Sequence, residues 1–281
     1  MLAPLQEPFM QRALAEVVLL GIAGGALGCW VVFYGLSYAA ESLSHSIFPG
    51  LVLVAVAGIP LLFGAVPAIV VAALAIALAA RIAGIDREAA VAVVVTTMFG
   101  LGVLLALSPQ SPPGIESLLF GDVFGVTDAD LATAAGLAVL VAVALRLLHG
   151  RLLIAGFDRG TARSLGISPE IADAALLVLL AAGIVVAAQG LGNLLVVAVF
   201  VGPAAAARRL SDRMLSMMVL AAALAVLAGV AGLYLSYYAG TAGGASVALA
   251  IVAVYVLSLP AGRLRMLRRH SRVAPAGVTV T

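Results

Sequence analysis

Long apolar runs dominate this sequence, and each is about as long as a membrane is thick. A helix needs about 20 apolar residues to cross the hydrocarbon layer, and a spanning segment must satisfy its backbone polar groups internally. Hydrophobic residues make up 64% of the 281 residues and charged residues 10%, whereas soluble domains have roughly 45–50% and 25%. The sequence therefore predicts an all-α, polytopic membrane helix bundle and excludes a soluble globular domain.

The apolar runs can be placed as nine membrane-spanning helices. The predicted spans are 14–36, 39–58, 61–81, 88–107, 131–149, 172–189, 191–208, 214–236 and 244–262. The second contains Pro49-Gly50 and the seventh contains Gly202-Pro203. Because proline removes a backbone donor from a helix, we expect some interrupted helices and a total of about eight or nine spans.

Arginine placement gives the expected orientation. The sequence has 15 basic residues and no lysine, and with nine spans 14 of its arginines fall on one side of the membrane. By the positive-inside rule, the C-terminus is expected in the cytoplasm and the N-terminus outside. The domain prediction is an extracytoplasmic segment over 1–13, one transmembrane domain over 14–262, and a basic cytoplasmic tail over 263–281 that is expected to be disordered.

Composition excludes further classes. A P-loop requires a lysine that contacts the nucleotide phosphates, so any ATP that drives this protein is expected to bind another polypeptide. The single cysteine, Cys29, excludes an internal disulfide and a thiolate metal cluster within one chain. A formal net charge of +2 is too small to indicate a nucleic-acid partner.

Glu41 and His45 are the ionisable pair of the second predicted span. Four residues of spacing place both on one face of a helix, and such groups are costly in hydrocarbon unless they have a function. Carboxylate and imidazole ligands suit first-row divalent metals. If the span begins near Ser37, His45 lies about eight residues, or ~12 Å, into the membrane, just before the expected kink at Pro49 and Gly50. Transporters commonly place substrate sites at such helices, so the pair predicts a metal transport site.

The segment around this pair carries a family resemblance. Residues 34–50, YGLSYAAESLSHSIFPG, resemble the signature of the membrane permease subunit of bacterial ABC importers for zinc, manganese and iron. Glu41 stands where that family usually has Asp, which adds one methylene and keeps the ligand chemistry. Further stretches resemble family elements in the family's order over nearly the whole chain: 117–122 (SLLFGD), 158–167, 189–207 and, more loosely, 236–246.

The resemblance implies a mechanism with several partners. They are a second permease chain in a homodimer, a cytoplasmic ABC ATPase that binds the ATP, and an extracytoplasmic metal-binding protein. The chain itself would be a transport subunit of the bacterial plasma membrane and not an enzyme. It would bind no permanent cofactor and would pass zinc or manganese, with iron as a further candidate, across Glu41 and His45 in a dimeric pore.

The resemblance also identifies a coupling segment. Residues 158–167 are similar to the cytoplasmic stretch that leads into the family's coupling helix. Residues 158–173 also form the longest polar segment that joins two predicted spans on the cytoplasmic side. The residues expected to contact the ATPase are Asp158, Ala162, Arg163, Leu165, Gly166 and Ile167. The alternative interpretation is an ordinary solvated loop that obeys the positive-inside rule.

An acidic loop is expected on the opposite side of the membrane. Asp122, Asp128 and Asp130 could attract cations or contact the metal-binding protein through their negative field. Acidic loops also result from membrane orientation alone. Gln189 and Asn193, near an external turn, are interpreted as packing and capping groups.

Other functions remain open on sequence grounds. Glu41 and His45 would also suit a proton relay in a proton-coupled secondary metal transporter that works without an ATPase. An intramembrane enzyme would need a second metal-ligand cluster, such as H-E-x-x-H, that the sequence lacks. A purely structural hydrogen bond between helices and a related permease for larger metal chelates are the remaining alternatives.

Overall fold

The computed structural model describes residues 6–82, 87–109, 111, 114, 117–193 and 195–273. Within these ranges all regular secondary structure is helical, which confirms the predicted all-α class. The helices are α1 (Pro8–Phe33), α2 (Ser37–Val56), α3 (Leu62–Ala79), α4 (Arg87–Ala106), α5 (Ser117–Phe120), α6 (Asp128–Phe157), α7 (Arg159–Ser164), α8 (Pro169–Leu191), α9 (Val196–Leu210), α10 (Met214–Ala239) and α11 (Gly243–Val273), with a 3-10 turn, η2 (Val123–Gly125), before α6.

Seven helices in the described part of the chain are long and apolar enough to cross a membrane: α1, α2, α4, α6, α8, α10 and α11. The other two predicted spans, 61–81 and 191–208, correspond to the shorter helices α3 and α9. The 15 residues of α9 rise about 22 Å at 1.5 Å per residue, less than the hydrocarbon thickness of about 30 Å. The predicted count of eight or nine therefore includes one helix, α9, that is short for a complete crossing, whereas the 18 residues of α3 lie at the lower limit of the usual range.

Two local expectations are corrected. Pro49 and Pro203 lie inside helices that continue past them, so neither proline interrupts its helix; each removes one hydrogen bond, and the residues on both sides remain helical. The tail was expected to be disordered from residue 263, but α11 stays helical to Val273. Arginine, leucine and methionine, which dominate this extension, are good helix formers. Residues 274–281 lie outside the described ranges.

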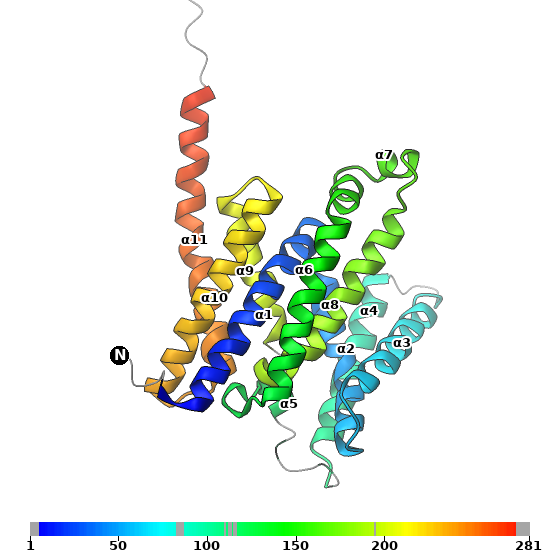
Figure 1. Ribbon diagram of the computed structural model, residues 1–281. Coiled ribbons are helices and arrows are strands. Elements are labelled where there is room, and N and C mark those ends of the chain that lie inside the picture. Colours follow the sequence, from blue (N-terminus) through cyan, green and yellow to red (C-terminus); the bar gives the residue numbers. More distant parts are fainter. Residues whose placement is uncertain are drawn as a thin grey trace, which may run out of the picture.

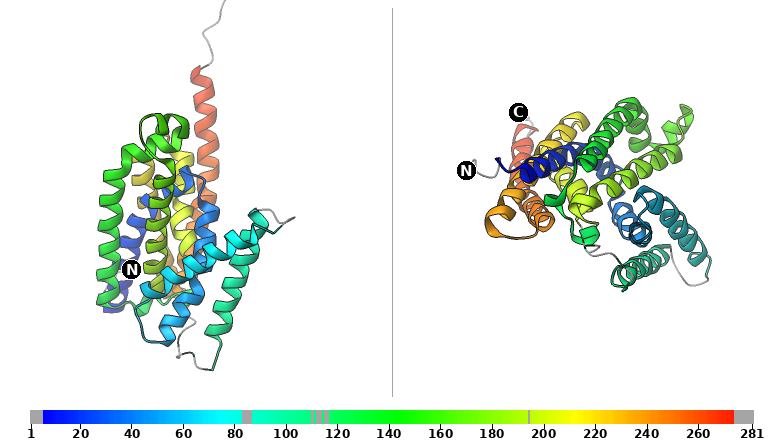
Figure 2. Two further views of the ribbon diagram at one scale, coloured as in Figure 1. Left: turned by 90° about the vertical axis from the view of Figure 1, so that its right-hand side faces the viewer. Right: turned by 60° about the horizontal axis from the view of Figure 1, so that its bottom comes forward.

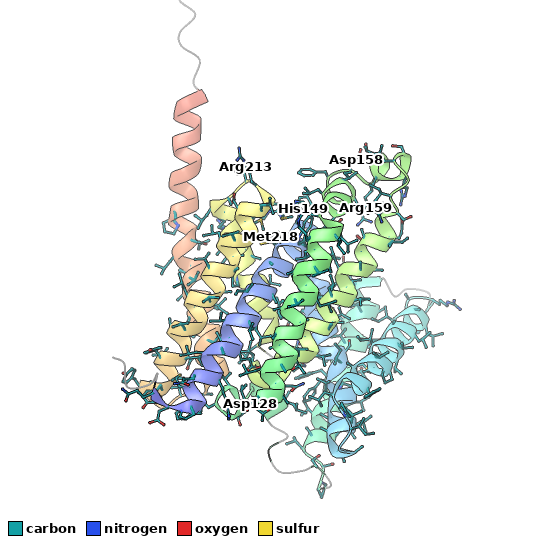
Figure 3. All side chains as sticks on the ribbon, viewed as in Figure 1. Asp128, His149, Asp158, Arg159, Arg213 and Met218 are labelled. Atoms are coloured by element: carbon teal, nitrogen blue, oxygen red, sulfur yellow. The ribbon has the colours of Figure 1, made fainter. Side chains whose placement is uncertain are left out.

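The arginine-rich regions around α7, after α9 and at the end of α11 gather at one end of the bundle, whereas the end of α3 lies about halfway along it (Figure 1). α7, the turn between α9 and α10, and the end of α11 lie at this end, which we call the basic end, whereas the start of α1 lies at the other. Figure 3 places His149, Asp158 and Arg213 toward the basic end and Asp128 at the opposite end. There Arg12 Nε lies 2.9 Å from Asp128 Oδ1, which joins the starts of α1 and α6.

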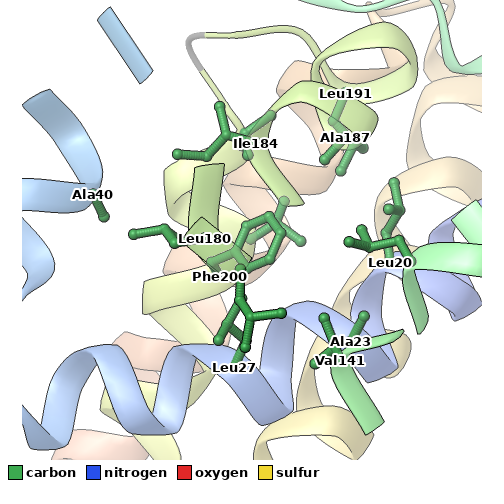
Figure 4. Close-up of a cluster of buried hydrophobic side chains, with 14 of the residues drawn as sticks. Leu20, Ala23, Leu27, Ala40, Val141, Leu180, Ile184, Ala187, Leu191 and Phe200 are labelled. Atoms are coloured by element: carbon green, nitrogen blue, oxygen red, sulfur yellow. The ribbon is translucent and has the colours of Figure 1, made fainter. Parts of the chain in front are cut away.

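The main core forms around α1, whose central part is largely buried. α1 packs against α10, α9, α6 and α8. Phe200 of α9, 1% exposed, lies among Leu27, Leu180 and Ile184 in the close-up of this core (Figure 4). α9 is thus enclosed by longer helices, which explains how a helix of its length remains inside the bundle.

Helices α2, α3 and α4 form a second group along one side of the bundle (Figure 2). α2 packs mainly on α4 and α3, and it also contacts α8 and α9. The tightest crossing within this group is between Gly50 of α2 and Gly64 of α3, where a Cβ on Gly50 would lie 2.1 Å from the Gly64 carbonyl oxygen. α2 therefore stands between the α1 core and the outer helices, with the Glu41–His45 pair in its first half.

Candidate metal site and coupling segment

Glu41 and His45 contact each other on α2, as their spacing predicts. His45 Nε2 lies 3.0 Å from Glu41 Oε1, and the two side chains are 23% and 51% exposed. Two ligands that bind one ion at about 2.1 Å and at right angles are about 3.0 Å apart. The separation is that of a hydrogen bond between the two side chains, and it is also compatible with two adjacent ligands of one ion in a right-angle arrangement.

The histidine ring is fixed by its neighbours. Phe99 of α4 packs against it, with ring centroids 4.8 Å apart at 62°, and Phe99 also contacts Phe48, one turn further along α2. The second ring nitrogen, His45 Nδ1, is buried with no hydrogen-bond partner. An imidazole whose ring is held by packing and whose Nε2 faces a carboxylate is arranged to bind an ion together with that carboxylate.

Pro49 and Gly50 lie directly beyond the pair and are both buried. Pro49 has no N–H to donate to the His45 carbonyl one turn earlier. Gly50 lets α3 approach the α2 backbone. The two residues that were predicted as a pore kink thus set the packing of α2 on its neighbours, within a continuous helix.

A second polar contact anchors α2 next to His45, and sequence reasoning missed it. The Ser44 hydroxyl donates to the Asn193 carbonyl (2.6 Å), and the Asn193 side-chain amide donates to the Ser44 carbonyl (2.9 Å). Both residues are buried. The Asn193 backbone N–H donates to the Leu118 carbonyl (2.8 Å). Asn193, which lies between α8 and α9, is therefore more than the packing or capping group expected from the sequence: it joins α2, α5 and the α8–α9 junction.

One chain offers few metal ligands at this site. No group of three or more His, Cys, Asp or Glu side chains capable of holding a metal occurs in the described ranges. A mainly apolar cavity of about 690 Å³ lies between α2, α3, α4 and α8; Tyr38, Ser42 and Ser46 are its polar lining residues, and Glu41 and His45 do not line it. The partly exposed pair lies instead on another face of α2.

The predicted coupling segment is a short helix with defined ends. The Asp158 carboxylate accepts the Gly160 N–H (2.9 Å) and contacts the Thr161 hydroxyl; these two bonds keep the pKa of Asp158 below its usual range. At the other end, Gly166 has φ +73°, and the Gly166 and Ile167 N–H groups donate to the Arg163 and Ala162 carbonyls. This pattern is a Schellman motif.

Ion pairs attach α7 to α8. Arg159 Nη2 lies 3.0 Å from Asp173 Oδ2, and Arg163 Nη2 lies 2.5 Å from Glu170 Oε1. Ala162 is buried, while Leu165 is 62% exposed. The segment therefore presents an exposed apolar side chain at the basic end, and it is fastened to the helix whose other end carries Asn193. α8 begins just after Ser168, with Pro169 in its first turn.

The three aspartates of the predicted acidic loop each have a partner within the chain. Asp122 accepts the Gly125 N–H (3.0 Å), and Asp128 pairs with Arg12 at the start of α1. Asp130 accepts the Thr127 N–H (2.9 Å) while the Thr127 hydroxyl accepts the Asp130 N–H. The last arrangement is a capping box at the start of α6. In this structure the three carboxylates are therefore turn, ion-pair and capping groups.

Comparisons with known proteins give a consistent picture. A family model described as the ABC 3 transport family matches residues 6–261. The chain is 31% identical over 253 residues to the manganese import system permease protein ScaB of Streptococcus parasanguinis, which covers 90% of each protein. It is 31% identical over 266 residues to a probable iron transport system membrane protein of Haemophilus influenzae, which covers 95% of this chain and 98% of that protein.

A solved structure shares the fold over nearly the whole length. It is that of PsaBC from Streptococcus pneumoniae in complex with Fab, with a TM-score of 0.87 and 28% sequence identity. The match covers 94% of this chain and 96% of that one.

Proposed function

Because the chain belongs to the ABC 3 transport family, we propose that it is the membrane permease subunit of an importer of a divalent transition metal, driven by ATP bound to a separate chain. Relatives named for manganese import and iron transport support manganese or iron as the cargo. Carboxylate and imidazole ligands are compatible with both ions and with zinc. The names of the relatives therefore favour manganese or iron over zinc.

The observation that carries the proposal is the separation of 3.0 Å between Glu41 Oε1 and His45 Nε2. In the proposed mechanism an incoming ion replaces the hydrogen bond between these atoms and exchanges part of its water shell for both ligands. Two protein ligands form an open site, unlike the closed four-ligand cage of a structural zinc site. An ion bound by only two protein ligands is held weakly enough to dissociate from the site.

A second copy of the chain would complete the pore. Glu41 is half exposed, and the described residues of one chain supply no third ionisable ligand. Pairing two α2 faces would bring four such ligands together and enclose the ion between subunits. In this homodimer each chain would contribute Glu41 and His45 to one path.

The proposed orientation follows the charges. With α7 and the arginine-rich turns in the cytoplasm, the N-terminus lies outside a bacterial plasma membrane and the C-terminus inside. α7 would then dock on the cytoplasmic ATPase through Leu165 and its neighbours. The opposite end, with Asp122 and Asp128, would face an extracytoplasmic metal-binding protein.

The test is metal uptake by the assembled transporter in proteoliposomes. Glu41→Gln and His45→Ala are expected to lower manganese uptake at least tenfold while the complex stays assembled, because each removes a ligand. Glu88→Gln, the same change at an exposed carboxylate of α4, is the matched control and should transport normally. Normal uptake by either ligand variant would refute the proposed site.

The same preparation separates the proposal from a proton-coupled secondary transporter. ATP-driven import should continue when a protonophore collapses the proton gradient, and it should stop when ATP is withheld. Uptake that needs the gradient and ignores ATP would favour Glu41 and His45 as a proton relay.

A further inference from the structure

Two adjoining cavities at the basic end together have the shape and polarity of a lipid molecule. The first, about 470 Å³, runs between α1, α6 and α10 and is lined almost wholly by apolar side chains, with Ala23 and Ala26 of α1 among them. The second, about 670 Å³, opens at the basic end beside Arg208 and Arg213. His149 and Leu215 line both cavities. The two cavities therefore adjoin, and we call them together the α1–α6–α10 groove.

The depth of the apolar part fits one membrane leaflet. Along α6 its lining runs from Ala138 to His149, which is about 16 Å at 1.5 Å per residue. The hydrocarbon core is about 30 Å thick, so one leaflet is about 15 Å deep. Figure 3 shows the same order, with Met218 deepest, His149 above it and Arg213 nearest the basic end. The groove is therefore polar where headgroups lie and apolar where acyl chains lie.

The mouth of the groove carries more positive than negative charge. Arg208 and Arg213 line the outer cavity, with Asp212 as the acidic side chain, and Arg146 lines the upper part of the inner cavity, three residues before His149 on α6. Arg208 Nη1 donates to the Val32 carbonyl (3.0 Å), which holds the guanidinium at the mouth and leaves further donors for an anion. The Ser211 hydroxyl already donates to the Arg213 carbonyl (3.3 Å), which orders the turn. Arginine clusters between helices at the cytoplasmic side of membranes are the usual binding sites for anionic headgroups.

From this geometry we propose that the α1–α6–α10 groove binds an anionic glycerophospholipid, with the phosphate among Arg146, Arg208 and Arg213 and one acyl chain along α1. The apolar depth favours a lipid over a free phosphate, which would fill the mouth and leave the rest of the groove without an occupant. The bound lipid would join α1, α6 and the α9–α10 turn, so it would hold together helices that belong to the same core. The inference does not depend on which ion is transported.

The experiment is native mass spectrometry of the full-length chain from micelles doped with phosphatidylglycerol or phosphatidylcholine of matched acyl chains. We expect preferential retention of phosphatidylglycerol. Arg146→Gln combined with Arg213→Gln should reduce that retention on the order of 25-fold, because each arginine contributes about fivefold near an anionic headgroup. Arg81→Gln, an exposed arginine between α3 and α4, is the control and should bind like the wild type.

A second variant distinguishes the lipid from a free anion. Ala142→Trp places a large ring in the apolar part from an exposed position and leaves the arginines in place, so it should abolish retention of the lipid. Inorganic phosphate at millimolar concentration should not displace the lipid. Equal retention of both lipids, an unchanged double-arginine variant, or binding that phosphate displaces and Ala142→Trp leaves intact would each overturn the proposal.

Discussion

Ser44 anchors the part of α2 that carries the proposed metal ligand His45. Ser44 and Asn193 exchange two hydrogen bonds away from water, so removing either side chain leaves buried polar groups without partners. Such groups cost about 1–3 kcal/mol each. Because Ser44 directly precedes His45 in α2, loss of these hydrogen bonds should weaken ion binding at His45 as well as the stability of the fold.

The Ser44–Asn193 contact can be tested with a double-mutant cycle. Ser44→Ala and Asn193→Ala should each raise the KM for manganese uptake severalfold and lower thermal stability. The two variants remove different hydrogen bonds, because each side chain donates to the backbone carbonyl of the other residue and only the 3.2 Å bond between the Ser44 hydroxyl and Asn193 Oδ1 joins the two side chains. The effects of the two changes should therefore be close to additive in the double variant. A stability loss without any change in KM in either single variant would show that the contact supports only the fold.

Gly50 tests the packing of α2 on α3. A Cβ at this position would meet the Gly64 backbone at 2.1 Å, and backbone atoms cannot move aside as a flexible side chain could. Gly50→Ala should therefore destabilise the bundle by several kcal/mol and abolish uptake. Gly100→Ala is the matched control, because a Cβ on that helical glycine meets nothing within 4 Å. A normal melting temperature for Gly50→Ala would show that α2 and α3 are less closely packed than described.

At the scale of elements, α8 connects the coupling segment to the proposed metal site. Its start is tied to α7 by the Arg159–Asp173 and Arg163–Glu170 ion pairs, and the Asn193 contact with Ser44 follows its end. A helix of 23 residues transmits a displacement along its axis with little internal change. We therefore expect movement of α7 against the ATPase to reach α2 through α8.

The role of the Arg159–Asp173 pair in this connection can be tested by exchanging its two charges. Arg159→Asp and Asp173→Arg should each uncouple ATP hydrolysis from uptake, because each places two like charges together. The combined variant restores an opposite-charge pair and should recover most of the coupling. Since the pair is partly exposed, its effect on stability should be small. The decisive measurement is the number of ions imported per ATP hydrolysed; a combined variant that stays uncoupled would contradict the role of the pair.

The sequence predicted the elements well where one local rule decides the outcome. Apolar length placed each predicted span over a helix, although 191–208 also covers the break between α8 and α9, and four-residue spacing placed Glu41 beside His45. It failed where the outcome depends on distant packing. Asn193 pairs with a residue 149 positions away, and no local pattern marks that contact. The length of α9 was also missed, because its apolar run begins in the last turn of α8.

At the scale of the whole molecule, orientation in the membrane can be measured with introduced cysteines while the native cysteine stays in place. Cys29 is fully buried, so it should not react and need not be removed. Ala242→Cys, in the turn between α10 and α11, should react with a membrane-impermeant thiol reagent in intact cells. Gly150→Cys, at the basic end of α6 where a side chain meets nothing within 4 Å, should react only after the membrane is permeabilised. The reverse pattern would place the arginines outside and contradict the proposed docking of α7 on a cytoplasmic ATPase.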